Sequence, residues 1–458
     1  MTLTRIGVIS LGCPKNLVDT EVMLGHLDLE GWEFVSDPQE ADVIVINTCS
    51  FIASAREESI RTIIETAELK KTGRLRRLLV AGCMVQRYAE ELGREMPEVD
   101  AFIGLDELHR VAEFATGDDD ASADARLHDE TSEKREASRY LYDDITPRRL
   151  ATPPWTAYVK IAEGCDHTCA FCAIPSFRGG FRSRTPESVV AEAGALADKG
   201  VREVNLIAQD SSHYGKDLGG TVRLPDLLEK LDRIEALRWI RVHYLYPNSI
   251  TDRLIETMAG AERVVDYVDL PLQHAHPETL SRMRRGGSMR SHLELLDRMR
   301  RVMPRVALRS TFITGFPGET DEEFEMLLEF VREARFRHLG AFTYSHEEGV
   351  PAFDLPDDVP EEVKLERQDR LMACQQEIVF KENESLVGQT VEVLVEGAHA
   401  ETEHLLVGRT AGQAPEVDGQ VLINDGIAAP GSFVQVALTD VAGYDLVGRI
   451  EDSGRGIG

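Results

Sequence analysis

The first 116 residues alternate between short apolar runs and stretches in which apolar positions recur at helical spacing. Three of the runs are continuous and rich in β-branched residues, which predicts strands at residues 6–11, 42–47 and 77–81. Helical spacing predicts helices over residues 18–29, over residues 53–69 and from about Gln86. Continuous apolar strands that alternate with helices are typical of a parallel sheet covered on both faces. We therefore expect residues 1–116 to form an N-terminal parallel α/β domain.

The alternation continues between residues 151 and 382, where it predicts six strand-then-helix units. The expected strands lie near residues 157–161, 203–208, 239–245, 267–270, 306–313 and 339–344. Right-handed crossovers wind such units into an open or closed barrel. Because eight units are not visible, we expect a partial (β/α)6 barrel rather than a complete barrel of eight.

Two other segments differ from this alternating pattern of strands and helices. Residues 117–150 begin with Gly117-Asp-Asp-Asp and hold few apolar positions and no sustained period, which predicts a solvated, acidic interdomain linker. A charged amphipathic helix over Glu361–Leu386 then leads into residues 383–458, where apolar and polar residues alternate over 390–396 and 432–438. This last pattern predicts a small antiparallel β-barrel. The chain as a whole is predicted to be an α/β multidomain protein.

Charge and composition narrow the possible roles. The chain has 51 Lys+Arg against 80 Asp+Glu, a formal net charge of −29. Such a chain is a poor candidate for binding nucleic acid or anionic lipid by bulk electrostatics, and it would attract basic partners. No apolar run approaches the roughly 18–20 residues that span a bilayer, and the N-terminus shows no signal-peptide pattern. Seven cysteines, an odd number in a long chain, fit a reducing cytoplasm where thiolates bind metal. We therefore expect a cytoplasmic protein without membrane contact.

Three cysteines form the densest chemical motif, Gly164-Cys165-Asp-His-Thr-Cys169-Ala-Phe-Cys172. They follow the first strand of the six-unit section, on the side where α/β barrels place active sites. Three thiolates with no fourth cysteine nearby suit an iron–sulfur cluster that has one iron open to a small molecule. The alternatives are a zinc site completed by His167 and a group of unliganded thiols.

A second trio is dispersed in sequence but alike in position. Cys13, Cys49 and Cys83 each come just past the C-terminal end of a predicted parallel strand. Ligands of open α/β sheets bind at that edge, and adjacent strands lie only about 4.8 Å apart, so the three can converge on one metal cluster. The alternative is coincidence, because free cysteines are often buried as small apolar residues. The seventh cysteine, Cys374, has Leu371 and Ile378 at helical spacing and is expected to pack on a helix face.

These motifs together resemble a known family. Cys165-x-x-x-Cys169-x-x-Cys172, with Phe171 before the last cysteine, resembles the radical S-adenosylmethionine motif. With the upstream trio, the partial barrel and the terminal β-barrel, the chain resembles the methylthiotransferase family of radical S-adenosylmethionine enzymes. In that family the last two parts are called the radical SAM and TRAM domains. The resemblance implies two [4Fe–4S] clusters, on Cys13, Cys49 and Cys83 and on Cys165, Cys169 and Cys172, with S-adenosyl-L-methionine bound at the open iron of the barrel cluster.

The family contains transfer RNA modifiers and a protein modifier, and four segments of this chain resemble the latter. These are Gly12-Cys-Pro-Lys-Asn-Leu-Val-Asp-Thr-Glu21, Ile46-Asn-Thr-Cys-Ser-Phe-Ile52, Ile174-Pro-Ser-Phe-Arg-Gly179 and Ala208-Gln-Asp-Ser-Ser-His-Tyr-Gly215. Transfer RNA enzymes typically have Gln-Met in place of Pro14-Lys15, and Thr20 stands where Ser is expected. The protein modifier is a transferase that methylthiolates the β-carbon of an aspartate in ribosomal protein S-twelve. In it, a radical formed by reductive cleavage of S-adenosylmethionine removes the β-hydrogen, so no side chain is assigned a general-base role.

Loops at other strand ends are expected to shape the S-adenosylmethionine pocket. The candidate contacts are Phe171, Gln209, Gln273 and Gly315. Gly315-Phe-Pro-Gly could instead be only a tight turn before a helix capped by Thr320. No Walker loop and no G-x-G-x-x-G follows a strand, so nucleotide hydrolysis and a Rossmann dinucleotide site lack support.

The partners expected are a protein substrate and an electron-donating reductant. Residues 383–458 hold 12 acidic and 3 basic residues, whereas phosphate binding favours a basic face. RNA binding by this module is therefore doubtful, and a basic ribosomal protein suits it better. The alternative substrate is a transfer RNA adenosine, and from another class, the chain could be a two-cluster electron carrier that turns over no substrate.

Overall fold

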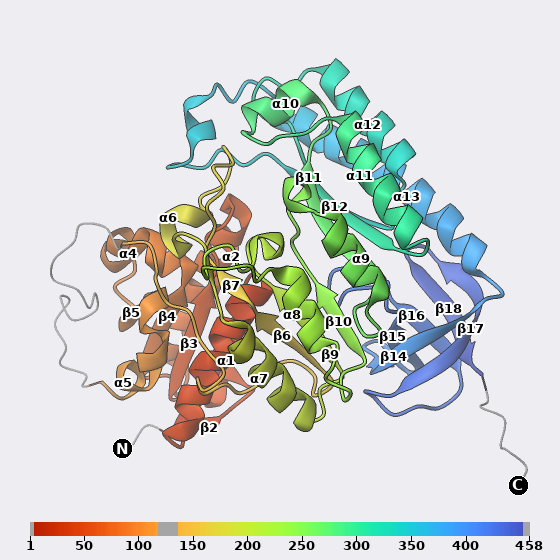
Figure 1. Ribbon diagram of the computed structural model, residues 1–458. Helices are drawn as coiled ribbons and strands as arrows, with labels where there is room; N and C mark the ends of the chain where they lie inside the picture. Colours follow the sequence, from red (N-terminus) through yellow and green to blue (C-terminus); the bar gives the residue numbers. More distant parts are fainter. Residues whose placement is uncertain (1–3, 118–135, 452–458) are drawn as a thin grey trace, which may run out of the picture.

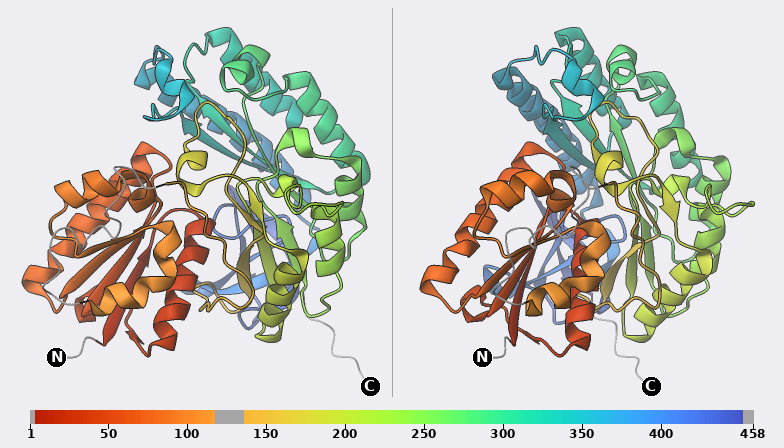
Figure 2. Two further views of the ribbon diagram at one scale, coloured as in Figure 1. Left: turned by 60° about the vertical axis from the view of Figure 1, so that its left-hand side comes forward. Right: turned by 90° about the vertical axis from the view of Figure 1, so that its left-hand side faces the viewer.

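The computed structural model describes residues 4–117 and 136–451, which form three packed parts (Figure 1). The N-terminal domain stands beside one edge of the central barrel (Figure 2), and the terminal β-barrel packs against the lower end of the central barrel in Figure 1. Within the described ranges, none of the helices has the length and apolar character that crossing a bilayer requires.

The N-terminal domain is a five-stranded parallel sheet with the strand order β2-β1-β3-β4-β5. The strands are β1 (Arg5–Ser10), β2 (Glu33–Phe34), β3 (Val43–Thr48), β4 (Arg77–Gly82) and β5 (Ala101–Ile103). The helices are α1 (Pro14–Leu29), α2 (Ala53–Ala67), α3 (Leu69–Thr72), α4 (Cys83–Glu95) and α5 (Val111–Thr116). Two separate apolar clusters cover the two faces of the sheet. The three predicted strands are confirmed, while β2 and β5 are too short to give a periodic signal.

The six predicted strands of the central section are confirmed as parallel strands in two three-stranded sheets. One sheet holds β6 (Thr156–Lys160), β9 (Glu203–Ile207) and β10 (Trp239–Val242), and the other holds β11 (Tyr267–Gln273), β12 (Ala307–Thr314) and β13 (His338–Thr343). A single bridge between Ile240 and Val264 continues the surface from one sheet to the other. The two sheets therefore make a partial barrel.

Helices cover the outer face of this partial barrel (Figure 1). They are α7 (Pro186–Asp198), α8 (Leu224–Leu231), α9 (Asp252–Gly260), α11 (Met289–Val302) and α12 (Asp321–Ala334). At the C-terminal ends of the strands lie α6 (Ile174–Arg178), which contacts α4 of the N-terminal domain, and α10 (Pro277–Arg282). Two short paired strands, β7 (Ala162–Glu163) and β8 (Arg182–Ser183), lie at the two ends of the loop that carries Cys165, Cys169 and Cys172. Cys374 packs partly buried against the barrel core, as its helical spacing predicts.

The long helix α13 (Glu361–Leu386) leads into a closed five-stranded barrel. Its strands are β14 (Thr390–His399), β15 (Thr402–Arg409), β16 (Val421–Asp425), β17 (Phe433–Ala442) and β18 (Asp445–Ile450). The pairings are antiparallel as predicted, except that β16 and β18 run parallel. Alternate residues such as Val393, Val395 and Val436 fill its core.

The described part of the expected linker departs from the sequence prediction. Residues 118–135 lie outside the described residues, but residues 136–150 pack between the N-terminal domain and the barrel. Ser138 and Tyr142 are each only 2% exposed. The guanidinium of Arg148 binds Glu21 on α1 and Glu192 on α7. This segment therefore joins the two domains through a buried ion-pair network instead of lying in solvent.

Candidate metal and cofactor site

The dispersed cysteine trio, Cys13, Cys49 and Cys83, lies at the C-terminal edge of the N-terminal sheet. Strand register aligns Ser10 with Asn47 and Thr48 with Gly82, so Cys49 and Cys83 directly follow a pair of aligned residues. Cys13 follows β1 and immediately precedes α1, whose backbone begins with Leu17 N–H donating to the Cys13 carbonyl. The structure therefore brings these three residues, far apart in sequence, to adjacent strand ends.

Two glycines allow this close approach. Gly82 has φ +96°, and a Cβ there would lie 2.1 Å from Asn47 Oδ1. Gly12 has φ +89°, and a Cβ there would lie 3.1 Å from the sulfur of Cys49. Only glycine adopts such backbone without steric cost, so both turns leave room for the sulfurs to face one another.

Buried polar groups surround these sulfurs. Cys83 Sγ lies 3.2 Å from Asn16 Oδ1, and Arg178 Nη2 donates to it at 3.1 Å. Burial raises the pKa of the Cys83 thiol to about 12, and burial also raises the pKa of Cys49. Burial therefore disfavours the thiolate form at these positions. A bound metal would stabilise it, because a metal deprotonates the thiols that coordinate it.

The barrel trio, Cys165, Cys169 and Cys172, lies on the loop that follows β7, at the C-terminal edge of the partial barrel. Gly164 has φ +80°, and a Cβ there would lie 2.1 Å from the Gly180 carbonyl oxygen. Cys165 N–H donates to the Gly179 carbonyl, and Ala170 N–H to the Met283 carbonyl. The loop is thus tied down on both sides. Burial raises the pKa of Cys165 to about 11 and that of Cys172 to about 12.

The donor set fits an iron–sulfur cluster better than a zinc ion at both places. All six cysteines are free thiols. Each trio offers three cysteine sulfurs, whereas structural zinc sites are almost always closed by four ligands. Three thiolates can hold an iron–sulfur cluster that has one iron open. The zinc alternative therefore needs a fourth ligand besides the cysteines.

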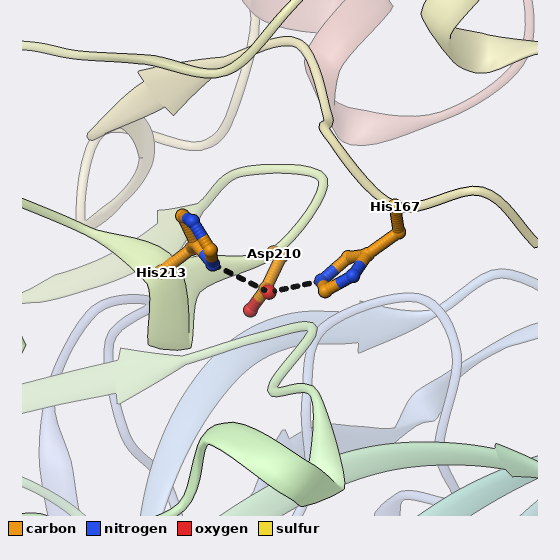
Figure 3. A group of neighbouring side chains, drawn as sticks. All are labelled: His167, Asp210 and His213. Atoms are coloured by element: carbon orange, nitrogen blue, oxygen red, sulfur yellow. Dashed lines mark hydrogen bonds and ion pairs between the residues drawn. The ribbon is translucent and has the colours of Figure 1, made fainter. Parts of the chain in front are cut away.

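His167, the residue weighed as a fourth zinc ligand, is engaged elsewhere. Its Nε2 lies 2.7 Å from Asp210 Oδ2 (Figure 3). Its ring also stacks on Tyr246, with the ring centroids 3.9 Å apart. His213 approaches the same carboxylate at 3.8 Å. Burial opposes ionisation of Asp210, but hydrogen bonds from His167 and Ser212 outweigh it and lower its pKa.

These three side chains are a poor cation site although their ligand atoms lie within 4.8 Å of one another. Lys216 Nζ lies 3.2 Å from His213 Nδ1, so an ammonium already occupies that edge. Burial and the Lys216 charge both lower the pKa of His213. The group instead fixes the cysteine loop, through His167, to the loop that follows β9.

The four candidate cofactor contacts all lie at C-terminal strand ends. Phe171 lies between two cysteines and packs against an apolar cluster. Gln209 follows β9 and donates to Glu163, while its Oε1 is buried and has no hydrogen-bond partner among the described residues. Gln273 ends β11 at φ +72°. Gly315 follows β12, the strand next to β11, at φ +71°.

Gly315 also belongs to a tight turn. A Cβ there would lie 2.2 Å from Lys364 Cγ, and its N–H donates to Glu319 at 3.0 Å. Thr320 caps α12 together with Glu323, as the alternative reading of this turn expects. The side of Gly315 that would carry a side chain therefore faces protein.

Sequence reasoning missed a buried charge network between the two trios. Arg178, at the end of α6, donates to Asp19 at 3.0 Å and to Glu163 at 2.9 Å. Lys160 Nζ lies 2.5 Å from Asp19 and 2.8 Å from Glu163. Burial opposes ionisation of Glu163, but Arg178 and Lys160 outweigh it and lower its pKa. Arg178 and Asp19 lie in two of the quoted motifs, Ile174–Gly179 and Gly12–Glu21, but nothing in the sequence indicated that they are partners.

Tyr246 and Arg285 complete the surroundings of the barrel trio. The Arg285 guanidinium lies 4.4 Å from the centre of the Tyr246 ring, and its Nη1 lies 3.5 Å from Cys169 Sγ. Tyr246 follows β10, whereas Arg285 follows α10 and carries no sequence signal. The site is therefore assembled from loops of both barrel sheets.

Comparison with known proteins agrees with this arrangement. Family descriptions match the chain as the radical SAM superfamily over residues 159–331, uncharacterized protein family UPF0004 over 5–104, and the TRAM domain over 387–450. The solved radical S-adenosylmethionine methyltransferase TsrM from Kitasatospora setae has the same fold, with a TM-score of 0.55 at 13% identity over 82% of this chain and 89% of its own.

Curated relatives are much more similar in sequence. The ribosomal protein uS12 methylthiotransferase RimO of Anaeromyxobacter sp. is 51% identical over 98% of this chain and 93% of its own length. RimO of Geobacter sulfurreducens is 48% identical over 97% of this chain and 98% of its own. The chain therefore belongs to the RimO family of radical S-adenosylmethionine methylthiotransferases.

Proposed function

We propose that this chain transfers a methylthio group to the β-carbon of an aspartate of ribosomal protein uS12. The observation that carries this proposal is the presence of two cysteine trios at C-terminal sheet edges, in a chain about half identical to named uS12 methylthiotransferases. Arg178 of the barrel domain also donates to Cys83 of the N-terminal trio. Neither trio is needed for an S-adenosylmethionine enzyme that transfers only a methyl cation, because simple nucleophilic transfer requires no cluster.

The family implies S-adenosylmethionine and a [4Fe–4S] cluster, and we propose that Cys165, Cys169 and Cys172 hold that cluster. We further propose a second [4Fe–4S] cluster on Cys13, Cys49 and Cys83. When bound, these groups supply the radical chemistry that opens an unactivated C–H bond and the sulfur that is transferred. The protein contributes orientation and exclusion of water, and no side chain acts as a general base in this proposal.

For S-adenosylmethionine we propose contacts from Phe171, Gln209, Gln273 and Gly315. Gln209 has the strongest support, because its buried Oε1 is an unused acceptor at the strand edge beside the cysteine loop. An ammonium group of the cofactor would satisfy it. Gly315 can contribute only backbone, since its side-chain direction is filled by Lys364.

For partners we propose a basic protein substrate and an external one-electron reductant. The functional division we propose is residues 1–116 for the second cluster, 117–150 as a connecting segment, 151–382 for the radical domain and 383–458 for the TRAM domain. The TRAM residues hold 12 acidic against 3 basic residues, which favours a basic protein over RNA.

Mass spectrometry of cells lacking this protein tests the substrate. We expect ribosomal protein uS12 from these cells to lose a methylthio modification, while transfer RNA keeps its own. Loss of a transfer RNA modification with unchanged uS12 would instead assign the RNA substrate. Purified protein given a reductant and S-adenosylmethionine should also produce 5′-deoxyadenosine, which an electron carrier would not do.

A further inference from the structure

Arg178 is the one side chain of the barrel domain that donates a described hydrogen bond to a cysteine of the N-terminal domain. It ends α6, six residues beyond Cys172, and is only 3% exposed. Arg178 closely follows the barrel trio in sequence, but its Nη2 lies 3.1 Å from the sulfur of Cys83 in the N-terminal domain. A residue that closely follows the barrel trio in sequence therefore donates to a sulfur of the other trio.

The guanidinium is held in place by four protein partners. Nη1 donates to Glu163, and Nη2 is shared by Asn16, Asp19 and Cys83 at 2.8, 3.0 and 3.1 Å. Arginine stays protonated in proteins, and its planar fork fixes the direction of its N–H groups. The sulfur of Cys83 thus faces a permanent positive charge and an N–H donor that cannot rotate away.

The protein charges around Arg178 balance one another. Around Arg178 stand two carboxylates, Asp19 and Glu163, and a second buried cation, Lys160. Two acids therefore offset two bases, so these groups leave no excess negative charge to oppose the N–H donor that faces the sulfur of Cys83. The barrel trio receives a weaker counterpart, because Arg285 approaches Cys169 only to 3.5 Å and is partly exposed.

We propose that Arg178 is a positioning residue that raises the reduction potential of the cluster on Cys13, Cys49 and Cys83. This inference rests on the proposed second cluster. Hydrogen bonds to ligand sulfurs, net charge and solvent exposure set the potentials of iron–sulfur clusters. Reduction adds one electron, and therefore one negative charge, to the cluster. A fixed N–H donor and positive charge at a ligand sulfur stabilise the reduced form more than the oxidised form.

The test uses the full chain carrying Cys165→Ala, Cys169→Ala and Cys172→Ala, so that only the proposed N-terminal cluster contributes. Anaerobic redox titration followed by electron paramagnetic resonance then compares Arg178, Arg178→Lys and Arg178→Met in this background. Iron and sulfide are counted in each sample. Arg184→Lys is the matched control, because Arg184 is a buried arginine of the same domain that binds Glu192 and has no described contact with a cysteine.

We expect Arg178→Met to lower the reduced-to-oxidised ratio at a fixed solution potential at least tenfold, about 59 mV for a one-electron couple. Arg178→Lys keeps the charge but loses the fork, so it should shift the ratio in the same direction by less. The Arg184→Lys control should leave the ratio unchanged.

The outcomes separate this inference from the proposal beneath it. If the triple-alanine background holds no iron, the second cluster itself is wrong. If it holds about four irons and both Arg178 variants titrate like the background, the role of Arg178 is wrong. If the Arg178→Met variant does not retain its cluster, the Arg178→Lys variant provides the test. A cluster potential in Arg178→Lys equal to that of the triple-alanine background overturns the inference.

Discussion

Arg409 and Glu203 form a buried ion pair that joins the terminal β-barrel to the radical domain. Arg409 Nη2 lies 2.7 Å from Glu203 Oε2, and the two side chains are 1% and 0% exposed. Glu203 begins β9, so this pair anchors the terminal barrel at the N-terminal ends of the radical-domain strands, opposite the edge that carries the cysteines. Arg241 adds a second contact to the same carboxylate at 3.2 Å.

Glu203→Gln should loosen the terminal barrel. Removing one partner of a buried pair leaves the other charge uncompensated and costs about 3–5 kcal/mol. Hydrogen exchange should therefore show lower protection of β14–β18, because regional opening reports local stability. Glu392→Gln is the matched control: it breaks the exposed pair with Arg238 across the same interface and should cost at most about 1 kcal/mol. Equal effects of the two substitutions would contradict this view.

The same pair predicts how the interface responds to acid. Burial opposes ionisation of Glu203, but Arg409 and Arg241 outweigh it and lower its pKa to about 2. A carboxylate whose pKa is lower in the folded state than in the unfolded state stabilises the fold fully at pH values above its unfolded pKa, about 4.3 for Glu. This contribution is lost as the pH falls toward the folded pKa. Protection of the terminal barrel should therefore decline between about pH 4 and pH 2 in the parent protein. The Glu203→Gln variant should lack this component of the decline.

Anaerobic reconstitution should give about eight irons per chain, as two four-iron clusters require. Substituting Cys165, Cys169 and Cys172 together by Ala should leave about four. Cys374→Ala should leave the count at about eight, since Cys374 packs on α13 away from both trios. A parent count near four would remove the second cluster from the proposal.

The two trios should fail in different ways. Without Cys165, Cys169 and Cys172, the protein should form no 5′-deoxyadenosine, because no group remains to pass an electron to S-adenosylmethionine. Without Cys13, Cys49 and Cys83, it should still cleave S-adenosylmethionine but attach no methylthio group to uS12. Normal product from the second variant would mean that those cysteines are structural.

Reversing exposed acids of the terminal barrel should weaken binding to uS12. Glu392 and Glu396 are unsuitable, because they already bind Arg238 and Arg409. Glu401, Asp425 and Asp440 are exposed and carry no described ion pair, so their replacement by Lys changes surface charge without breaking the interface. Complementary charge speeds association and is screened over about 10 Å at 0.1 M salt.

The readout for these substitutions is binding to uS12 and to transfer RNA across a salt series, with S-adenosylmethionine cleavage as the control activity. We expect weaker uS12 binding, less salt dependence and unchanged cleavage. Tight, saturable binding of the parent protein to transfer RNA, without binding to uS12, would favour the RNA-modifying alternative.

The sequence by itself determined the architecture and the six cysteines. Strands β3, β4, β6, β9 and β12 and the helix Glu361–Leu386 carry their period in contiguous residues, because local burial on one or both faces imposes it. Cys13, Cys49 and Cys83 were identifiable because each follows a predicted strand, and Cys165, Cys169 and Cys172 because they form one compact motif. Topology alone then places the first three at one edge of the N-terminal sheet.

Only the tertiary structure decided which charges surround those cysteines. Arg178 and Cys83 are 95 residues apart in sequence, and Arg178 and Asn16 are 162 apart. Contacts of this kind depend on how two domains dock, and no local period encodes docking. The same reason explains why Arg148, in a segment predicted to be solvated, forms buried ion pairs with two domains. It also explains why Glu392 and Glu396 of the terminal barrel are paired with arginines. The sequence shows which side chains are charged, but the packing of the domains against one another determines which charged side chains form pairs.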